Sequence, residues 1–129
     1  MVKRAKTRFI NVDLDVRAKT DLAGLVPAFE PGAYVLGCMP AKGGYFANWE
    51  LAGQPREPNV AIRRFVRLIE ALPPKARGIW NRASKREFSI GVEAGLLPGS
   101  VEFAIRSTTL KLAASVGAGV IFVVYVLRE

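Results

Sequence analysis

Residues 112–127 read LAASVGAGVIFVVYVL and carry no charged side chain, in a chain of 129 residues with a formal net charge of +8. Such a run fits either a membrane-spanning helix or a strand covered on both faces. A spanning helix needs about 20 apolar residues, so this run is short. It also divides at Gly117, where a helical pattern gives way to β-branched and aromatic residues typical of strands. We therefore predict a helix followed by a buried strand, Gly119 to Leu127, in the middle of a sheet, and no membrane anchor.

Period-two alternation of apolar and polar residues predicts further strands, most clearly in FINVDLDV at residues 9–16. The remaining predicted strands are AYVLGCM from Ala33 and YFANWELA at 45–52, joined as a hairpin by the turn at 41–44, and alternating segments at 88–92 and 101–105. We interpret Trp49, on the second strand of the hairpin, as a core residue.

Helical spacing of apolar residues is clearest after Asn59, which we expect to cap a helix to Leu72. Further helices are expected at 21–29, from Pro73-Pro74 through Ala83, and from Thr108 to a stop at Gly117. The predicted order is β-α-β-β-α-α-β-β-α-β. This order favours an α+β fold with a mainly antiparallel sheet of about six strands and helices packed on one face. We expect a basic N-terminal arm at residues 1–8 and a single domain at 9–129.

The chain has no histidine and one cysteine, Cys38. These counts exclude Ser-His-Asp and Cys-His catalysis, histidine-based metal sites and intrachain structural zinc. We assign no catalytic residue and expect no metal and no cofactor. Cys38 lies among apolar residues and is predicted to be a small core residue. With no disulfide and no apolar run near the N-terminus, a cytoplasmic location is expected.

Polar residues gather on the predicted outer face of the sheet. Asp13 and Asp15 project from one face of their strand, roughly 7 Å apart. The candidate binding residues are Asn11, Asp13, Asp15, Asn48, Glu50 and Glu93. Such a face is either ordinary solvated surface, a protein contact surface, or an acid–base or cation-binding cluster.

Basic residues form a second candidate surface. Nucleic-acid phosphates are bound by such clusters, although no nucleic-acid-binding motif accompanies this one. The candidate residues are Lys3, Arg4, Arg63, Arg64 and Arg67. The plainer interpretation is a solvated basic surface.

Four segments carry a resemblance to a known family: FINVDLDV, NWELAG, FSIGVEAG and STTLKLAASVGAGVIFVVYV. Together they resemble a family of small bacterial α+β domains of unknown function with immunity-protein-like relatives. The resemblance implies a binding role and no catalytic residue. Immunity proteins that neutralise nucleases are often acidic, whereas this chain is basic, so any target should be acidic or should meet the acidic sheet face.

The leading hypothesis is a non-enzymatic cytosolic binding module with a protein partner. The alternatives are a nucleic-acid-binding protein and a carboxylate-dependent enzyme. A homodimer through an exposed edge strand is a further alternative, and no membrane association is expected.

Overall fold

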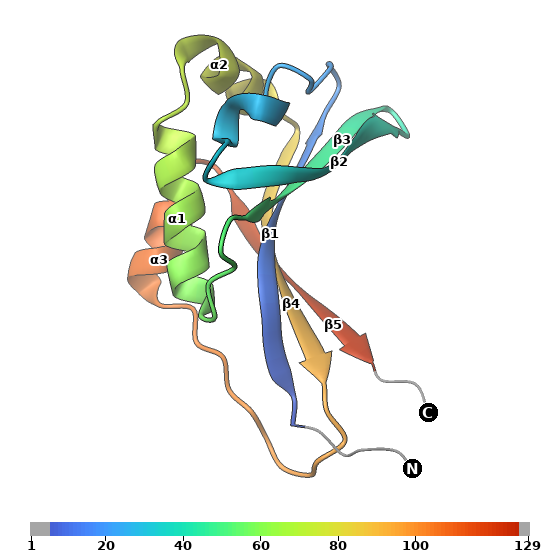
Figure 1. Ribbon diagram of the computed structural model, residues 1–129, viewed down its shortest axis with the longest axis vertical. Helices are drawn as coiled ribbons and strands as arrows, with labels where there is room; N and C mark the ends of the chain where they lie inside the picture. Colours follow the sequence, from blue (N-terminus) through green and yellow to red (C-terminus); the bar gives the residue numbers. More distant parts are fainter. Residues whose placement is uncertain (1–5, 127–129) are drawn as a thin grey trace.

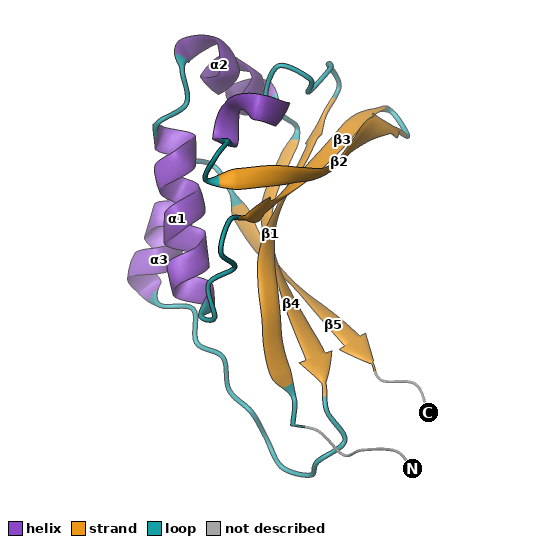
Figure 2. Cartoon of the chain, in the orientation of Figure 1, coloured by secondary structure: helices purple, strands orange, loops and turns teal. Residues whose placement is uncertain are grey.

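The computed structural model describes residues 6–126, which form a five-stranded sheet with three α-helices on one side (Figures 1 and 2). The sheet order is β2-β3-β1-β4-β5. In chain order the elements are β1 (Arg8–Ala18), the 3-10 helix η1 (Val26–Phe29), β2 (Ala33–Ala41), β3 (Gly44–Leu51), α1 (Pro58–Glu70), α2 (Pro74–Arg82), β4 (Lys85–Ala94), α3 (Ser107–Ser115) and β5 (Gly119–Val126). The predicted α+β class is confirmed.

Strand β1 is the central strand, and it pairs antiparallel with β3 and β4. Its alternating residues behave as predicted, because Leu14 and Val16 are fully buried against the helices while Asp13 and Asp15 face the other side. The strand begins at Arg8, the last residue of the expected arm. Of that arm, Lys3 and Arg4 lie outside the described residues.

The core lies between the sheet and the helices and includes both tryptophans. The indole N–H of Trp49 donates to the Val26 carbonyl at 3.2 Å, and that of Trp80 donates to the Val116 carbonyl at 2.9 Å. Because both donors have partners, both rings can be completely buried. The prediction of Trp49 as a core residue is confirmed.

Helix α1 is amphipathic as predicted, but its cap differs. The side chain of Glu57, not that of Asn59, accepts the N–H groups of Asn59 and Val60. Pro58 then occupies the first helical position, where its missing N–H costs nothing. Gly117, with a positive φ of 75°, follows α3 as predicted.

The sheet has five strands rather than about six, and it is mixed rather than wholly antiparallel. Strand β5 runs parallel to β4, its only neighbour in the sheet among residues 6–126. Residues 101–105, predicted as a strand, lie in an irregular segment at 95–106. The alternation of apolar and polar residues in this segment does correspond to burial, because Phe103 and Ile105 pack against the core. The segment gains this burial beside the helices without joining the sheet.

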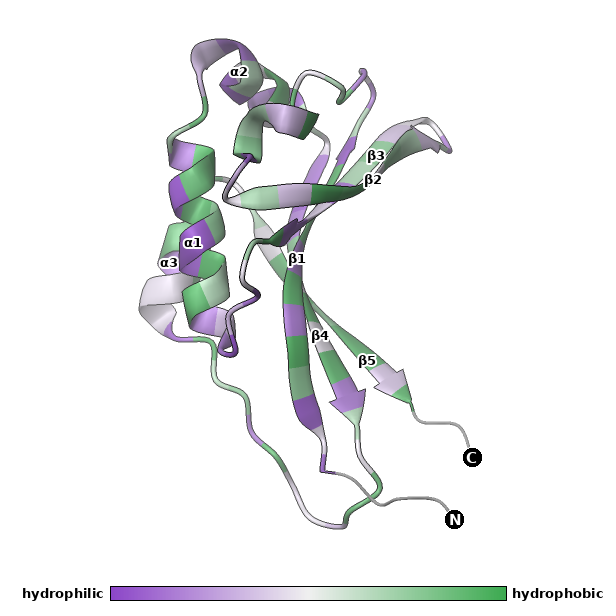
Figure 3. Cartoon of the chain, viewed as in Figure 1, coloured by the Kyte–Doolittle hydropathy of each residue, from purple (hydrophilic) through white to green (hydrophobic). Residues whose placement is uncertain are grey.

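The position of β5 also corrects the prediction, because β5 is an edge strand and not a buried central one. Phe122 is 54% exposed and Val124 is 56% exposed. Figure 3 shows the strand as largely hydrophobic, running down and away from the helices. A run that is apolar on both faces was interpreted as covered on both faces, but the helices reach only its first residues. Leu127, the predicted end, lies outside the described residues.

Two smaller predictions are also wrong. The helix expected at 21–29 is a turn followed by the four-residue η1, which has Pro27 in its first turn. Cys38 is exposed rather than in the core, because β2 is the other edge strand. Within residues 6–126, no helix is both long enough and apolar enough to cross a membrane.

Candidate binding surface

The face of the sheet opposite the helices is not covered by any other described element (Figure 2). We call this face the open face. Its central rows come from β3, β1 and β4, whose registers place Glu50, Asp13 and Ser89 in one row. The next row along the strands contains Asn48, Asp15 and Glu87.

Hydrogen bonds within the open face hold the carboxylates in place. The Asn11 side chain donates to Asp13 Oδ1 at 3.2 Å, and Gln54 Nε2 donates to Glu50 Oε2 at 3.1 Å. Of the candidate residues predicted from the sequence, five thus lie in adjacent positions on the open face: Asn11, Asp13, Asp15, Asn48 and Glu50.

Burial and neighbouring negative charge both raise the pKa values of Asp13 and Asp15. Partial burial, followed by the charges of Asp15 and Glu50, raises the pKa of Asp13 to about 6. Partial burial and then the charge of Glu87 raise the pKa of Asp15, while Arg17 opposes that shift. The centre of the open face therefore concentrates negative charge, and the nearest cations, Arg17 and Lys85, lie in the adjacent row.

The sixth candidate, Glu93, lies apart from this group. It sits opposite Arg8 near the end of the ladder, and its carboxylate forms an ion pair with the Arg8 guanidinium at 3.1 Å. Glu87 takes its place beside Asp15, with Lys85 at 3.5 Å. Glu87 was not predicted from the sequence, although it shares the period-two alternation of Glu93, and the register with β1 is what places it beside the aspartates.

Apolar and aromatic side chains flank the acidic centre. On the β2 side, Tyr34 lies next to Glu50, and Met39 lies next to Phe46, whose ring is contacted by Arg17 at 4.8 Å from its centroid. On the β5 side, the Tyr125 ring lies over Gly91. Tyr34 and Met39 are both exposed. The open face thus combines a charged centre with an apolar rim.

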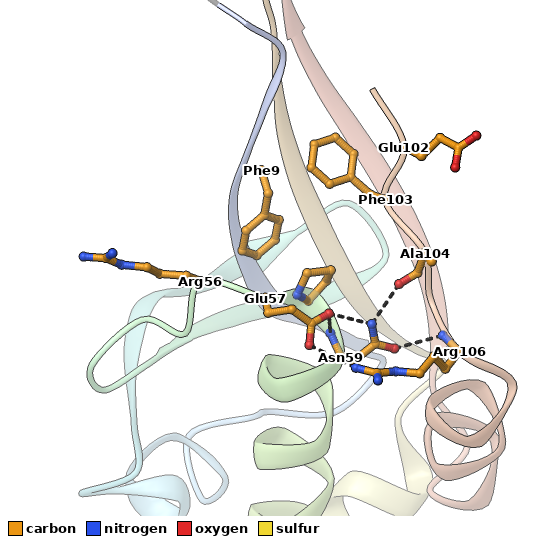
Figure 4. A pocket seen from close by; sticks show the side chains of 9 residues that line it. Phe9, Arg56, Glu57, Asn59, Glu102, Phe103, Ala104 and Arg106 are labelled. Atoms are coloured by element: carbon orange, nitrogen blue, oxygen red, sulfur yellow. Dashed lines mark hydrogen bonds and ion pairs between the residues drawn. The ribbon is translucent and has the colours of Figure 1, made fainter. Parts of the chain in front are cut away.

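Two cavities lie elsewhere among the described residues. One of about 440 Å³ is lined by Phe9, Glu57, Asn59, Phe103 and Arg106 among others (Figure 4). The Asn59 side chain donates to the Ala104 carbonyl at 2.8 Å and accepts the Arg106 N–H at 2.9 Å. These bonds tie the irregular segment 95–106 to the first turn of α1.

The carboxylate in this cavity belongs to Glu57, and its hydrogen-bond donors come from the protein itself. Burial alone would raise the pKa of Glu57, but hydrogen bonds from the Asn59 side chain, from two backbone N–H groups and from Arg106 outweigh that effect and lower it. Figure 4 shows Glu57, Asn59 and Arg106 directed at one another. The group is a structural clasp between α1 and segment 95–106.

The helix layer carries the basic candidates. Arg63, Arg64 and Arg67 are exposed on α1, and among residues 6–126 none of them forms an ion pair with a carboxylate. Arg64 and Arg67 line a shallow cavity of about 270 Å³, where Arg64 approaches the Ala52 carbonyl at 3.5 Å. The basic and acidic candidates therefore lie on opposite sides of the molecule.

Within the described residues, no three carboxylate or cysteine side chains are arranged to hold a metal ion. No protein-family model, no curated protein and no solved structure matches the chain at a significant level.

Proposed function

We propose that the chain is a protein-binding module whose contact surface is the open face of the sheet. The observation that carries this proposal is the acidic centre, in which Asp13 and Asp15 are held half-buried beside Glu50 and Glu87. Asp13, Asp15 and Glu50 form no ion pair among the described residues, and a face that concentrates such charge within an apolar rim differs from a uniformly solvated surface.

A partner with a lysine or arginine at the centre of its own surface would relieve this repulsion. The cation would neutralise the aspartates, while apolar side chains of the partner would cover Tyr34 and Met39. An immunity-like role fits the same geometry if the neutralised protein presents a basic surface. The net charge of +8 does not oppose this contact, because the helix layer that carries much of it faces the other way.

The acidic centre also makes binding depend on pH. A partner cation stabilises the ionised form of Asp13, so binding releases a proton when the pH is near the pKa of about 6. We expect affinity to increase as the pH rises through this value. Affinity that is constant from about pH 5 to pH 8 would place the contact away from Asp13.

The decisive experiment is affinity capture with the immobilised chain, with and without nuclease, at low and moderate salt. The test variant combines Asp13→Asn with Glu50→Gln, which keeps side-chain shape and removes charge. The matched control combines Arg64→Ala with Arg67→Ala on the opposite side. A nuclease-resistant partner that is lost with the test variant and retained with the control is expected. A partner that both variants retain equally would refute the open face as the contact surface.

Nucleic-acid binding is the second candidate function, and the exposed arginines of α1 favour it. The helix layer as a whole is basic, because α1, α2 and α3 contain one acidic residue, Glu70. Their basic residues are Arg63, Arg64, Arg67, Lys75, Arg77, Arg82 and Lys111. Binding of this kind weakens steeply with salt. Retention of DNA or RNA at low salt that is lost with Arg64→Ala plus Arg67→Ala would support it, and equal retention by the variant would count against it.

The carboxylate-dependent enzyme is not proposed. It needs Asp13, Asp15 and Glu93 to converge on a cavity, whereas Glu93 is paired with Arg8 and the two cavities described above are lined by other residues.

A further inference from the structure

The outer edge of β5 is unpaired among the described residues, and its side chains are apolar or aromatic. Residues 120–126 read VIFVVYV, and no described strand pairs with their outer side. Side chains are exposed on both faces: Phe122 and Val124 on the helix side, and Tyr125 on the open face. Long, exposed, apolar edges of this kind pair readily with another strand.

The opposite edge of the sheet contrasts with β5. Strand β2 has a register shift between Val35 and Gly37, and it contains Pro40, which lacks a backbone donor. Bulges and prolines are the features that protect edge strands from pairing. Strand β5 has no proline, no charged residue and no register shift against β4 in residues 119–126. Of the two sheet edges formed by the described residues, β5 is therefore the one that lacks these protective features.

The charge distribution around β5 favours a second copy of the chain as its partner. Two molecules of net charge +8 repel each other, so self-association requires a neutral surface. Next to β5, Glu93 is neutralised by Arg8 and Glu87 by Lys85, at 3.1 and 3.5 Å. The strand itself is uncharged, so it is complementary to itself and offers no partner to a charged peptide.

We infer that two copies pair antiparallel along β5 about a two-fold axis at Val123, joining their sheets into one. Successive side chains along a strand point to opposite faces. For the helix-side residues of one copy to pair with the helix-side residues of the other, the numbers of any two paired residues must add to an even value. Centring the axis on Val123 pairs residues 120–126 entirely with one another. Phe122 then lies opposite Val124 of the second copy, and Ile121 lies opposite its Tyr125.

This arrangement places both helix layers on one side and both open faces on the other. It also brings the exposed apolar side chains of β5 into contact with those of the second copy on both faces. A single strand pair is a small interface, so we expect dissociation in the micromolar range. The inference concerns a different surface from the acidic centre and does not depend on the proposed partner.

The test is the molar mass of the full chain by sedimentation across the micromolar range. We expect a concentration-dependent monomer–dimer equilibrium for the wild type. Val124→Lys should raise the dissociation constant at least tenfold, because the two added charges lie diagonally across the axis in the dimer and far apart in the separate monomers. Leu36→Lys, at the equally exposed edge of β2 (50% against 56%), adds the same charge and should leave the equilibrium unchanged.

A charge swap tests the register. Adding Phe122→Glu to Val124→Lys places opposite charges across the axis and should restore dimerisation. A wild type that is monomeric throughout, or a dimer that Leu36→Lys disrupts and Val124→Lys does not, would overturn the inference. Failure of the swap to restore dimerisation would overturn the register.

A second measurement keeps the inference testable if a charged variant unfolds. Val123→Cys, in a Cys38→Ser background, brings two thiols together at the axis, where antiparallel strands have Cα atoms about 4.5–5.5 Å apart. Mild oxidation should give a covalent dimer in high yield. Leu36→Cys in the same background is the control, and equal cross-linking of both variants would contradict pairing along β5.

Discussion

Asp13 lies directly opposite Glu50 in the antiparallel ladder between β1 and β3. Two acidic side chains at facing positions of a sheet repel each other, and like charges in such pairs destabilise the strands that carry them. Asp15 adds a third negative charge on the same face, two residues along β1. This repulsion is located on β1, the central strand of the sheet. The opposite face of β1 is fully packed against the core.

Replacing Asp13 should therefore stabilise the fold in a pH-dependent way. The ordinary pKa of an aspartate is 3.8, and the pKa of Asp13 in the folded protein is about 6. Ionisation of Asp13 therefore costs more free energy in the folded protein than in the unfolded chain. The contribution of Asp13 to stability therefore falls as the pH rises from about 3.8 to about 6 and is constant above that range. Asp13→Asn removes that fall and, because solvent screens a half-exposed group, should gain about 1 kcal/mol at pH 8 and nothing below pH 4.

Urea unfolding at several pH values measures this difference. Glu70→Gln, an exposed change on α1, is the control and should be neutral at every pH. A gain from Asp13→Asn that is the same below pH 4 as at pH 8 would show that charge is not its cause.

Removing the Asn59 side chain should release segment 95–106 from α1. The side chain bonds to Glu57, Ala104 and Arg106 at 2.6, 2.8 and 2.9 Å, and Asn59 is 98% buried. Asn59→Ala leaves these partners unsatisfied and should cost about 2–4 kcal/mol. The amide of Arg106 should also lose its protection from hydrogen exchange.

The control for Asn59 is Asn81→Ala, which removes an exposed contact with Arg77. We expect that change to cost less than about 0.5 kcal/mol. Unaltered exchange at Arg106 in Asn59→Ala would contradict the role of the clasp.

Arg86 should not be replaceable by lysine. Its guanidinium donates to the carbonyls of Trp80 and Gly117 at 3.0 and 3.1 Å, and it lies 5.7 Å from the centroid of the Trp80 ring. A lysine keeps the charge but not the planar fork that reaches both carbonyls. We expect Arg86→Lys to cost about 1–2 kcal/mol in thermal or urea unfolding, while Arg82→Lys, at the exposed end of α2, should have no measurable effect.

The ion pair between Arg8 and Glu93 should contribute little to stability. The Arg8 side chain is 61% exposed, and exposed pairs are worth about 0–1 kcal/mol. A double-mutant cycle with Arg8→Ala and Glu93→Gln should give a coupling below about 0.5 kcal/mol at physiological salt. A coupling above about 1 kcal/mol would mean that Glu93 has a more specific role than the ion pair indicates.

Much of the open face could be predicted from the sequence because alternation is a local property. Polar residues of β1 and β3 fall on one face wherever those strands lie, so Asp13, Asp15 and Glu50 were identified together. The partners of each carboxylate depend on register between strands distant in the chain. For that reason the sequence favoured Glu93, while the structure places Glu87 beside Asp15.

The sequence by itself determined the class of fold, the amphipathic helix α1 and the inward-facing residues of β1, because each follows from the spacing of apolar side chains along a short segment. Only the tertiary structure decided that residues 101–105 stay outside the sheet and that β5 lies at its edge. The physical reason is that apolar side chains record a tendency to be buried, whereas burial itself depends on which distant segment covers them. In β5 the helices cover only the first residues, and the rest of the strand remains open to a partner.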